Sequence, residues 1–136
     1  YGRTLRPRLY TKFSHKKLRK LITLRHMGKF GKYPISQAEY YKDINKHKFT
    51  LSPQGSGIDC YRTWEAIYLK SIPIVQKSRH LNHFSDLPIL FTDDDYGEIN
   101  KRYLKERYEE MLEKEINIEK LKRSYWKDLI LKQNQL

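Results

Sequence analysis

The chain has 136 residues, of which 38% are hydrophobic and 32% are charged, so the sequence predicts one ordinary domain with a heavily solvated surface. Its longest apolar runs, residues 72–75 and 87–91, are far shorter than a membrane-spanning helix, and no span is expected in this segment. The one cysteine, Cys60, excludes an internal disulfide and a thiolate-rich zinc site. It is compatible with a reducing compartment but does not identify a cellular location.

The formal net charge is +12, and the N-terminal part is the most basic, because no acidic residue precedes Glu39. We expect residues 1–35 to form a basic segment in which residues 14–27 make one amphipathic helix, with apolar residues at helical spacing. This asymmetry favours an anionic partner, but a lysine-rich solvated surface explains it equally well. Aromatic residues between the cations also leave open a basic nucleic-acid-binding module without catalysis.

Residues 36–136 alternate between helical patterns and short strands, which predicts an α/β fold. A capping box at Ser36 and Glu39 predicts a helix that ends near Asn45. The other predicted elements are a strand at 47–52, a helix at about 59–69, buried strands at 72–75 and 87–91, and helices at about 96–114 and 116–133. The expected architecture is a Rossmann-like parallel sheet with flanking helices and a helical C-terminus.

A glycine-containing loop joins the first predicted strand to the helix at 59–69, in the stretch LSPQGSGIDCYRTWE at residues 51–65. In parallel sheets, ligands bind where such loops leave the carboxyl ends of the strands. Gly55 and Gly57 would let the backbone approach a phosphate closely, and the amides that open the helix would stabilise its charge. Arg62 would add a guanidinium to the phosphate oxygens.

Three side chains near this loop have two interpretations each. Glu65 lies three residues after Arg62, so it forms either a local ion pair with Arg62 or a carboxylate that accepts hydrogen bonds from a ribose. Asp59 is either the N-cap of the helix or a ligand contact. Trp64 shares an apolar helix face, which favours a core position over a stacking platform.

Residues 49–67, FTLSPQGSGIDCYRTWEAI, followed by SIPIV at 71–75 and DLPI at 86–89, resemble the donor-binding half of exostosin-like glycosyltransferases. The resemblance covers about forty residues, and its strand, loop, helix and second strand agree with the family in order and spacing. It implies the C-terminal half of a GT-B fold, in which two Rossmann-like domains enclose a nucleoside-diphosphate sugar. The implied activity is transfer of that sugar to a glycan or lipid acceptor.

The resemblance also implies roles for individual residues. By position, Arg62 would pair with the donor diphosphate, Glu65 would hold the ribose, and Asp59 would lie beside the donor. The loop residues Gly55, Ser56 and Gly57 would approach the diphosphate, and Pro53 would belong to the same donor-binding loop. No metal or other cofactor is implied.

Two features depart from the family pattern. Lys70 stands where the family usually has glycine after the helix, in a turn for which a positive φ is expected. Nothing in the chain resembles the acceptor-binding domain that is expected to supply the general base, so the catalytic residues are unassigned. An upstream domain or a second chain would complete the cleft, or the chain binds without catalysing.

Other polar groups do not make a convincing site. The run at residues 93–95 contains an Asp-x-Asp pattern, but its place between a buried strand and a helix favours helix capping over a metal. His80 and His83 lack enough neighbouring ligands for zinc, and Cys60 lies on an apolar helix face and is expected to be a small core residue.

Overall fold

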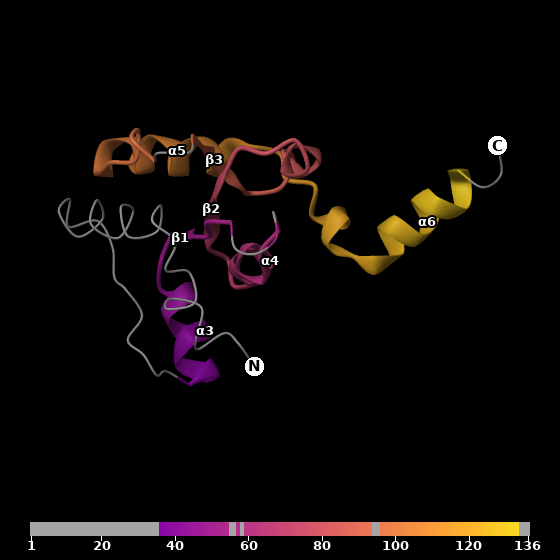
Figure 1. Ribbon diagram of the computed structural model, residues 1–136, viewed down its shortest axis with the longest axis horizontal. Coiled ribbons are helices and arrows are strands. Elements are labelled where there is room, and N and C mark those ends of the chain that lie inside the picture. Colours follow the sequence, from indigo (N-terminus) through magenta and orange to yellow (C-terminus); the bar gives the residue numbers. More distant parts are fainter. Residues whose placement is uncertain (1–35, 55–56, 58, 94–95, 134–136) are drawn as a thin grey trace.

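A computed structural model of the chain describes residues 36–54, 57, 59–93 and 96–133 (Figure 1). The predicted basic helix and its segment, residues 1–35, lie outside the described residues. Within them, β1 (Phe49–Leu51), β2 (Ile72–Gln76) and β3 (Leu90–Thr92) form one parallel sheet in the order β1-β2-β3. The predicted α/β class is confirmed, because this small parallel sheet with flanking helices has the form of a Rossmann-like half-domain.

The helices are α3 (Gln37–Asn45), α4 (Tyr61–Tyr68), α5 (Lys101–Glu113) and α6 (Arg123–Gln133), with short 3-10 helices η1 (Leu81–Phe84) and η2 (Ile118–Leu121). The predicted capping box begins α3: the Glu39 amide donates to Ser36 Oγ at 3.2 Å, and the Ser36 amide donates to Glu39 Oε2 at 3.0 Å. No helix among the described residues is long and apolar enough to cross a membrane.

The central strand β2 is buried on both faces, as predicted for a parallel sheet. Ile72 and Ile74 pack in a cluster with Leu90 and with apolar side chains of α5. Val75 packs in a second cluster with Ile67 of α4 and with residues from η1 and the turn that follows it. Figure 1 accordingly shows α5 and α4 on opposite sides of the sheet, and Tyr40 and Ile44 of α3 pack against Ala66 of α4.

The strand β3 begins at Leu90, three residues later than the predicted start at residue 87. The Leu87 amide donates to the Phe84 carbonyl at 3.0 Å, and the Ile89 amide donates to the Leu87 carbonyl at 2.8 Å. These hydrogen bonds form a turn after η1 and keep residues 87–89 out of the sheet ladder. Leu87 and Ile89 are nevertheless almost fully buried, so their hydrophobicity signalled burial rather than strand.

The predicted helix at 96–114 begins only at Lys101, because Asn100 is its N-cap and accepts a 2.9 Å hydrogen bond from the Tyr103 amide. Tyr96 has φ 55°, which a right-handed helix does not accommodate. The predicted helix at 116–133 is also divided, since Lys122 is extended between η2 and α6.

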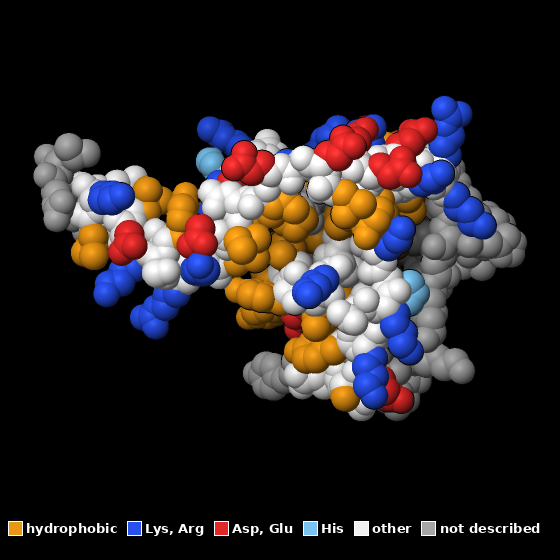
Figure 2. Space-filling model, turned by 180° about the vertical axis from the view of Figure 1, so that it is seen from behind, with side chains coloured by type: hydrophobic (Ala, Val, Ile, Leu, Met, Phe, Trp, Pro, Cys, Tyr) orange, Lys and Arg blue, Asp and Glu red, His pale blue; other side chains and the backbone are white. Residues whose placement is uncertain are grey.

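The helix α6 projects from the rest of the described chain and buries none of its residues (Figure 1). Leu129, Ile130 and Leu131 are 40%, 57% and 50% exposed, and hydrophobic side chains are visible on this helix in Figure 2.

Candidate functional site

The candidate site begins where β1 leaves the sheet. The Ser52 amide donates to the Ile74 carbonyl at 2.9 Å, which continues the pairing with β2 one residue past the strand. Its buried hydroxyl lies 2.8 Å from Thr63 Oγ1, so the start of the loop is tied to the first turn of α4. Pro53 is buried beside it. The loop therefore starts from a rigid position at the carboxyl edge of the sheet.

The glycine loop itself is only partly described. Gly55 and Ser56 lie outside the described residues, whereas Gly57 is exposed. A Cβ added at Gly57 would lie 3.6 Å from the carbonyl oxygen of Asp59, which is an ordinary van der Waals contact. The packing of the protein around Gly57 therefore does not itself demand a glycine at this position.

Arg62 reaches from the first turn of α4 to the end of β1. The residue is only 8% exposed, and its Nη1 donates to the Leu51 carbonyl at 3.3 Å. The hydrogen bond places a guanidinium at the carboxyl end of the strand, under the predicted loop. A cation that is this deeply buried has fewer orientations available than an exposed one, so its direction is largely set before any ligand binds.

Glu65 is directed to a different neighbour. Its Oε2 accepts a 3.0 Å hydrogen bond from the hydroxyl of Tyr40, a buried residue of α3. The sequence placed Arg62 and Glu65 on one side of the helix. In the structure, Arg62 donates a hydrogen bond to β1, and Glu65 accepts one from α3.

Asp59 is not the N-cap of α4, because Cys60 occupies that position and makes no side-chain capping hydrogen bond. Asp59 Oδ1 instead accepts a 2.8 Å hydrogen bond from Trp64 Nε1. Trp64 packs edge-on against Phe84, with ring centroids 5.0 Å apart, and it is half-buried beside the second core cluster. The core interpretation of Trp64 is thus confirmed, and so is that of Cys60, which is 6% exposed.

The helix α4 ends in a Schellman motif. The Ser71 amide donates to the Ala66 carbonyl at 2.9 Å, and the Lys70 amide donates to the Ile67 carbonyl at 3.0 Å. Lys70 has φ 61°, the left-handed conformation in which glycine is preferred. The positive φ expected at this position is confirmed, and it is adopted by a lysine.

Sequence reasoning missed the polar residues that β2 and β3 bring to the same edge. Gln76 is the last residue of β2, and its Oε1 lies 3.5 Å from the Gln54 amide of the glycine loop. Lys77 follows, and its Nζ lies 2.7 Å from Asp93 Oδ1, just after β3. The available signal was position, because residues that follow parallel strands meet at one edge of the sheet.

The expectation that the run at 93–95 caps the following helix is wrong, since Asn100 caps α5. Asp93 pairs with Lys77, and its amide donates to Glu98 Oε1 at 3.0 Å. Glu98 also accepts from the Thr92 hydroxyl. Burial would raise the pKa of Glu98, but the hydrogen bonds outweigh it and hold the pKa below its usual value. Residues 94 and 95 lie outside the described residues.

The described ranges contain no group of three or more His, Cys, Asp or Glu side chains arranged to hold a metal ion. His83 contributes its backbone carbonyl to a 2.9 Å hydrogen bond with Lys120.

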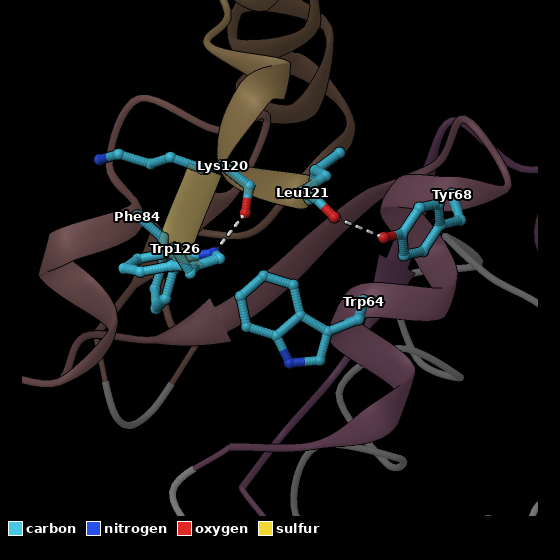
Figure 3. Close-up of a pocket in the computed structure, with 6 residues that line it drawn as sticks. All are labelled: Trp64, Tyr68, Phe84, Lys120, Leu121 and Trp126. Carbon is cyan, nitrogen blue, oxygen red and sulfur yellow. Dashed lines mark hydrogen bonds between the residues drawn. The ribbon is translucent and has the colours of Figure 1, made fainter. Parts of the chain in front are cut away.

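A pocket of about 330 Å³ lies where α4, η1, η2 and α6 meet (Figure 3). The Tyr68 hydroxyl donates to the Leu121 carbonyl and Trp126 Nε1 donates to the Lys120 carbonyl, each at 2.9 Å. These bonds attach the C-terminal segment to α4 and orient the base of α6. The lining residues come from separate parts of the sequence and are Trp64, Tyr68, Phe84, Lys120, Leu121 and Trp126.

A family model described as the RXYLT1 C-terminal domain, the C-terminal domain of a xylosyltransferase of the exostosin-like kind, matches residues 1–87. The match includes β1, the glycine loop, α4 and β2, and it ends before β3. A comparison with curated proteins found no match.

Proposed function

Because the chain belongs to the RXYLT1 C-terminal domain family, which is of the exostosin-like glycosyltransferase kind, we propose that it is the donor-binding half of a GT-B glycosyltransferase. Its ligand is a nucleoside-diphosphate sugar, and its reaction transfers that sugar to a glycan or lipid acceptor. An upstream domain or a second chain supplies the acceptor side of the cleft and the general base.

One observation carries the proposal: a buried guanidinium stands at the carboxyl end of a parallel strand, beside the loop that joins the strand to α4. Arg62 is held there by the Leu51 carbonyl at 3.3 Å. This edge of a parallel sheet is where nucleotides bind in related architectures. A buried, fixed cation suits a diphosphate because guanidinium groups pair with phosphate oxygens in a defined geometry.

The proposed reaction is direct displacement at the anomeric carbon, which leaves negative charge on the departing nucleoside diphosphate. Arg62 and the backbone amides around Gly57 stabilise that charge as it develops, so they act most strongly in the transition state. The loop residues Gly55 and Ser56 complete this anion site by the family resemblance. No metal ion takes part in the proposed step.

Glu65 is proposed to accept hydrogen bonds from the ribose hydroxyls. Tyr40 donates to one of its oxygens at 3.0 Å and so fixes the orientation of the carboxylate. A carboxylate has acceptor capacity beyond one such bond, so further hydrogen bonds from a diol remain compatible with the Tyr40 contact. Asp59, held by Trp64 beside Gly57, is proposed to border the same ligand.

Calorimetric titration of the full chain with UDP, GDP and UDP-xylose, with and without EDTA, tests the proposal. UDP-xylose is included because the matching family model is that of a xylosyltransferase. Arg62→Met keeps the aliphatic stem and removes the charge, and we expect it to weaken binding about tenfold or more. Binding that EDTA does not change is also expected.

Arg102→Met is the matched control, because Arg102 is an exposed arginine of α5 that pairs only locally, with Glu106 at 2.8 Å. It should bind as wild type does. The proposal is refuted if wild type binds none of the three nucleotides, or if a folded Arg62→Met protein binds them with unchanged affinity. A melting curve for each variant establishes that it is folded.

The alternative of a nucleic-acid-binding module is not supported by the family match. Its basic segment, residues 1–35, lies outside the described residues, so we propose no second function.

A further inference from the structure

A second cation lies at the carboxyl edge of the sheet, on the central strand. Lys77 directly follows β2. Oε1 of the preceding residue, Gln76, lies 3.5 Å from the backbone amide nitrogen of Gln54. Gln54 opens the glycine loop. Lys77 therefore emerges from the sheet next to the proposed diphosphate site, on the neighbouring strand to the one that Arg62 contacts.

The structure holds this lysine in place from β3. The Lys77 amide donates to the Thr92 carbonyl at 2.9 Å, and Nζ donates to Asp93 Oδ1 at 2.7 Å. The backbone of Asp93 is in turn held by the hydrogen bond that its amide donates to Glu98 Oε1. These contacts, at and just after the end of β3, thus orient the Lys77 ammonium along the edge of the sheet.

This ion pair has little value for stability, because the side chains of Lys77 and Asp93 are 62% and 65% exposed. Exposed pairs of this kind contribute little to stability, because water and salt screen the two charges. The hydrogen bond that Lys77 donates to Asp93 raises the pKa of Lys77, so the lysine keeps its charge at neutral pH. A charged, oriented and accessible ammonium is thereby available at the ligand edge.

We propose that Lys77 is a binding residue for the diphosphate of the donor, and that Asp93 holds its ammonium until the diphosphate displaces the carboxylate. The inference rests on the proposed function and extends the donor site from β1 to β2 and β3. Asp93 and the diphosphate compete for one cation, so the carboxylate opposes binding both by occupying Lys77 and by its own negative charge.

Because Asp93 and the diphosphate compete for Lys77, each substitution is expected to change the UDP affinity of the full chain in a defined direction. Lys77→Ala should weaken UDP binding about tenfold, and Lys77→Arg, which keeps the charge, should stay within about threefold of wild type. Asp93→Asn should tighten UDP binding about threefold, because it frees the ammonium and removes a negative charge.

Lys48→Ala is the matched control for the loss of one positive charge. Lys48 is also an exposed lysine beside a strand, but it directly precedes β1 and so lies at the amino edge of the same sheet. Its Nζ lies 4.0 Å from the ring centroid of Tyr108. We expect the affinity of the Lys48→Ala variant for UDP to stay within about twofold of wild type, because long-range charge effects are screened by salt.

Titrations with UDP and with inorganic pyrophosphate separate failure of this inference from failure of the proposed function. If wild type binds UDP and Lys77→Ala matches Lys48→Ala, the inference is overturned and the proposed function stands. Weaker UDP binding by Asp93→Asn overturns the competition. Pyrophosphate binding that depends on Lys77, with no added affinity for UDP, supports the anion site and overturns the nucleotide function. Absence of binding to both probes overturns both.

Discussion

Replacing Lys70 by glycine should stabilise the protein. Lys70 occupies the C′ position of the Schellman motif that ends α4, with φ 61°. The left-handed conformation costs a residue with a Cβ about 1–2 kcal/mol, whereas glycine adopts it freely. The greater backbone entropy of glycine in the unfolded chain offsets about 0.5–1 kcal/mol of this gain. The net increase in the free energy of unfolding should be about 0.5–1 kcal/mol.

Urea denaturation and thermal melting measure this change. A gain of 1 kcal/mol raises the melting temperature by about 4–8 °C in a domain of 60–100 residues, so we expect a rise of a few degrees. Lys70→Ala should be close to neutral, because it removes the charge and the stem but keeps the Cβ.

The same substitution at the end of α3 is the control. Lys46 is also an exposed lysine next to a helix end, but its φ is −75°, which any residue adopts. Lys46→Gly should therefore lower stability through the unfolded-chain entropy alone. The reasoning is refuted if Lys70→Gly destabilises the protein, or if the two glycine variants shift the stability in the same direction.

Two further predictions concern the attachment of the C-terminal segment. Burial would raise the pKa of Asp86, but the hydrogen bond from Lys120 outweighs it and lowers the pKa. The pair therefore stabilises the fold above the unfolded-state pKa of about 4 and loses this contribution as the pH falls through the lower folded value. The difference in unfolding free energy between wild type and Asp86→Asn should shrink over that range, and a difference independent of pH from 6 to about 2 would contradict the assignment. Trp126→Ala should release the base of α6 and cost about 1–2 kcal/mol, less than the loss of a core tryptophan, since Trp126 is 36% exposed. Amide exchange in α6 should accelerate, whereas Ile130→Ala, on an exposed part of the helix, should leave it unchanged.

Local sequence signals were sufficient wherever the physics is local. The capping box at Ser36 requires only residues three positions apart, and the structure contains it. The positive φ of Lys70 follows from the way a helix ends, and the burial of Cys60 follows from helical periodicity. The parallel sheet was likewise predictable, because short apolar runs between helices suit strands that are covered on both faces.

Sequence reasoning was undecided or wrong where two local structures compete. Both Asp59 and Cys60 precede α4, and the aspartate, the better N-cap by preference, bonds to Trp64 instead. The run at 87–91 is hydrophobic throughout, but the turn hydrogen bonds of residues 87–89 delay the strand to Leu90. The sequence pattern left the role of Asp59 open, and the bond to Trp64 excludes the N-cap. For residues 87–91 the pattern predicted a strand, and the turn hydrogen bonds correct its start.

The sequence by itself determined the order of the main helices and strands, the position of the glycine loop and the family to which the chain belongs. These features depend on residues that are close together in the chain. Only the tertiary structure decided that Arg62 is buried against β1 and that Lys77 meets Asp93 at 2.7 Å. The reason is register: β2 and β3 must pair in parallel, with Gln76 opposite Thr92, before residues sixteen positions apart share one edge.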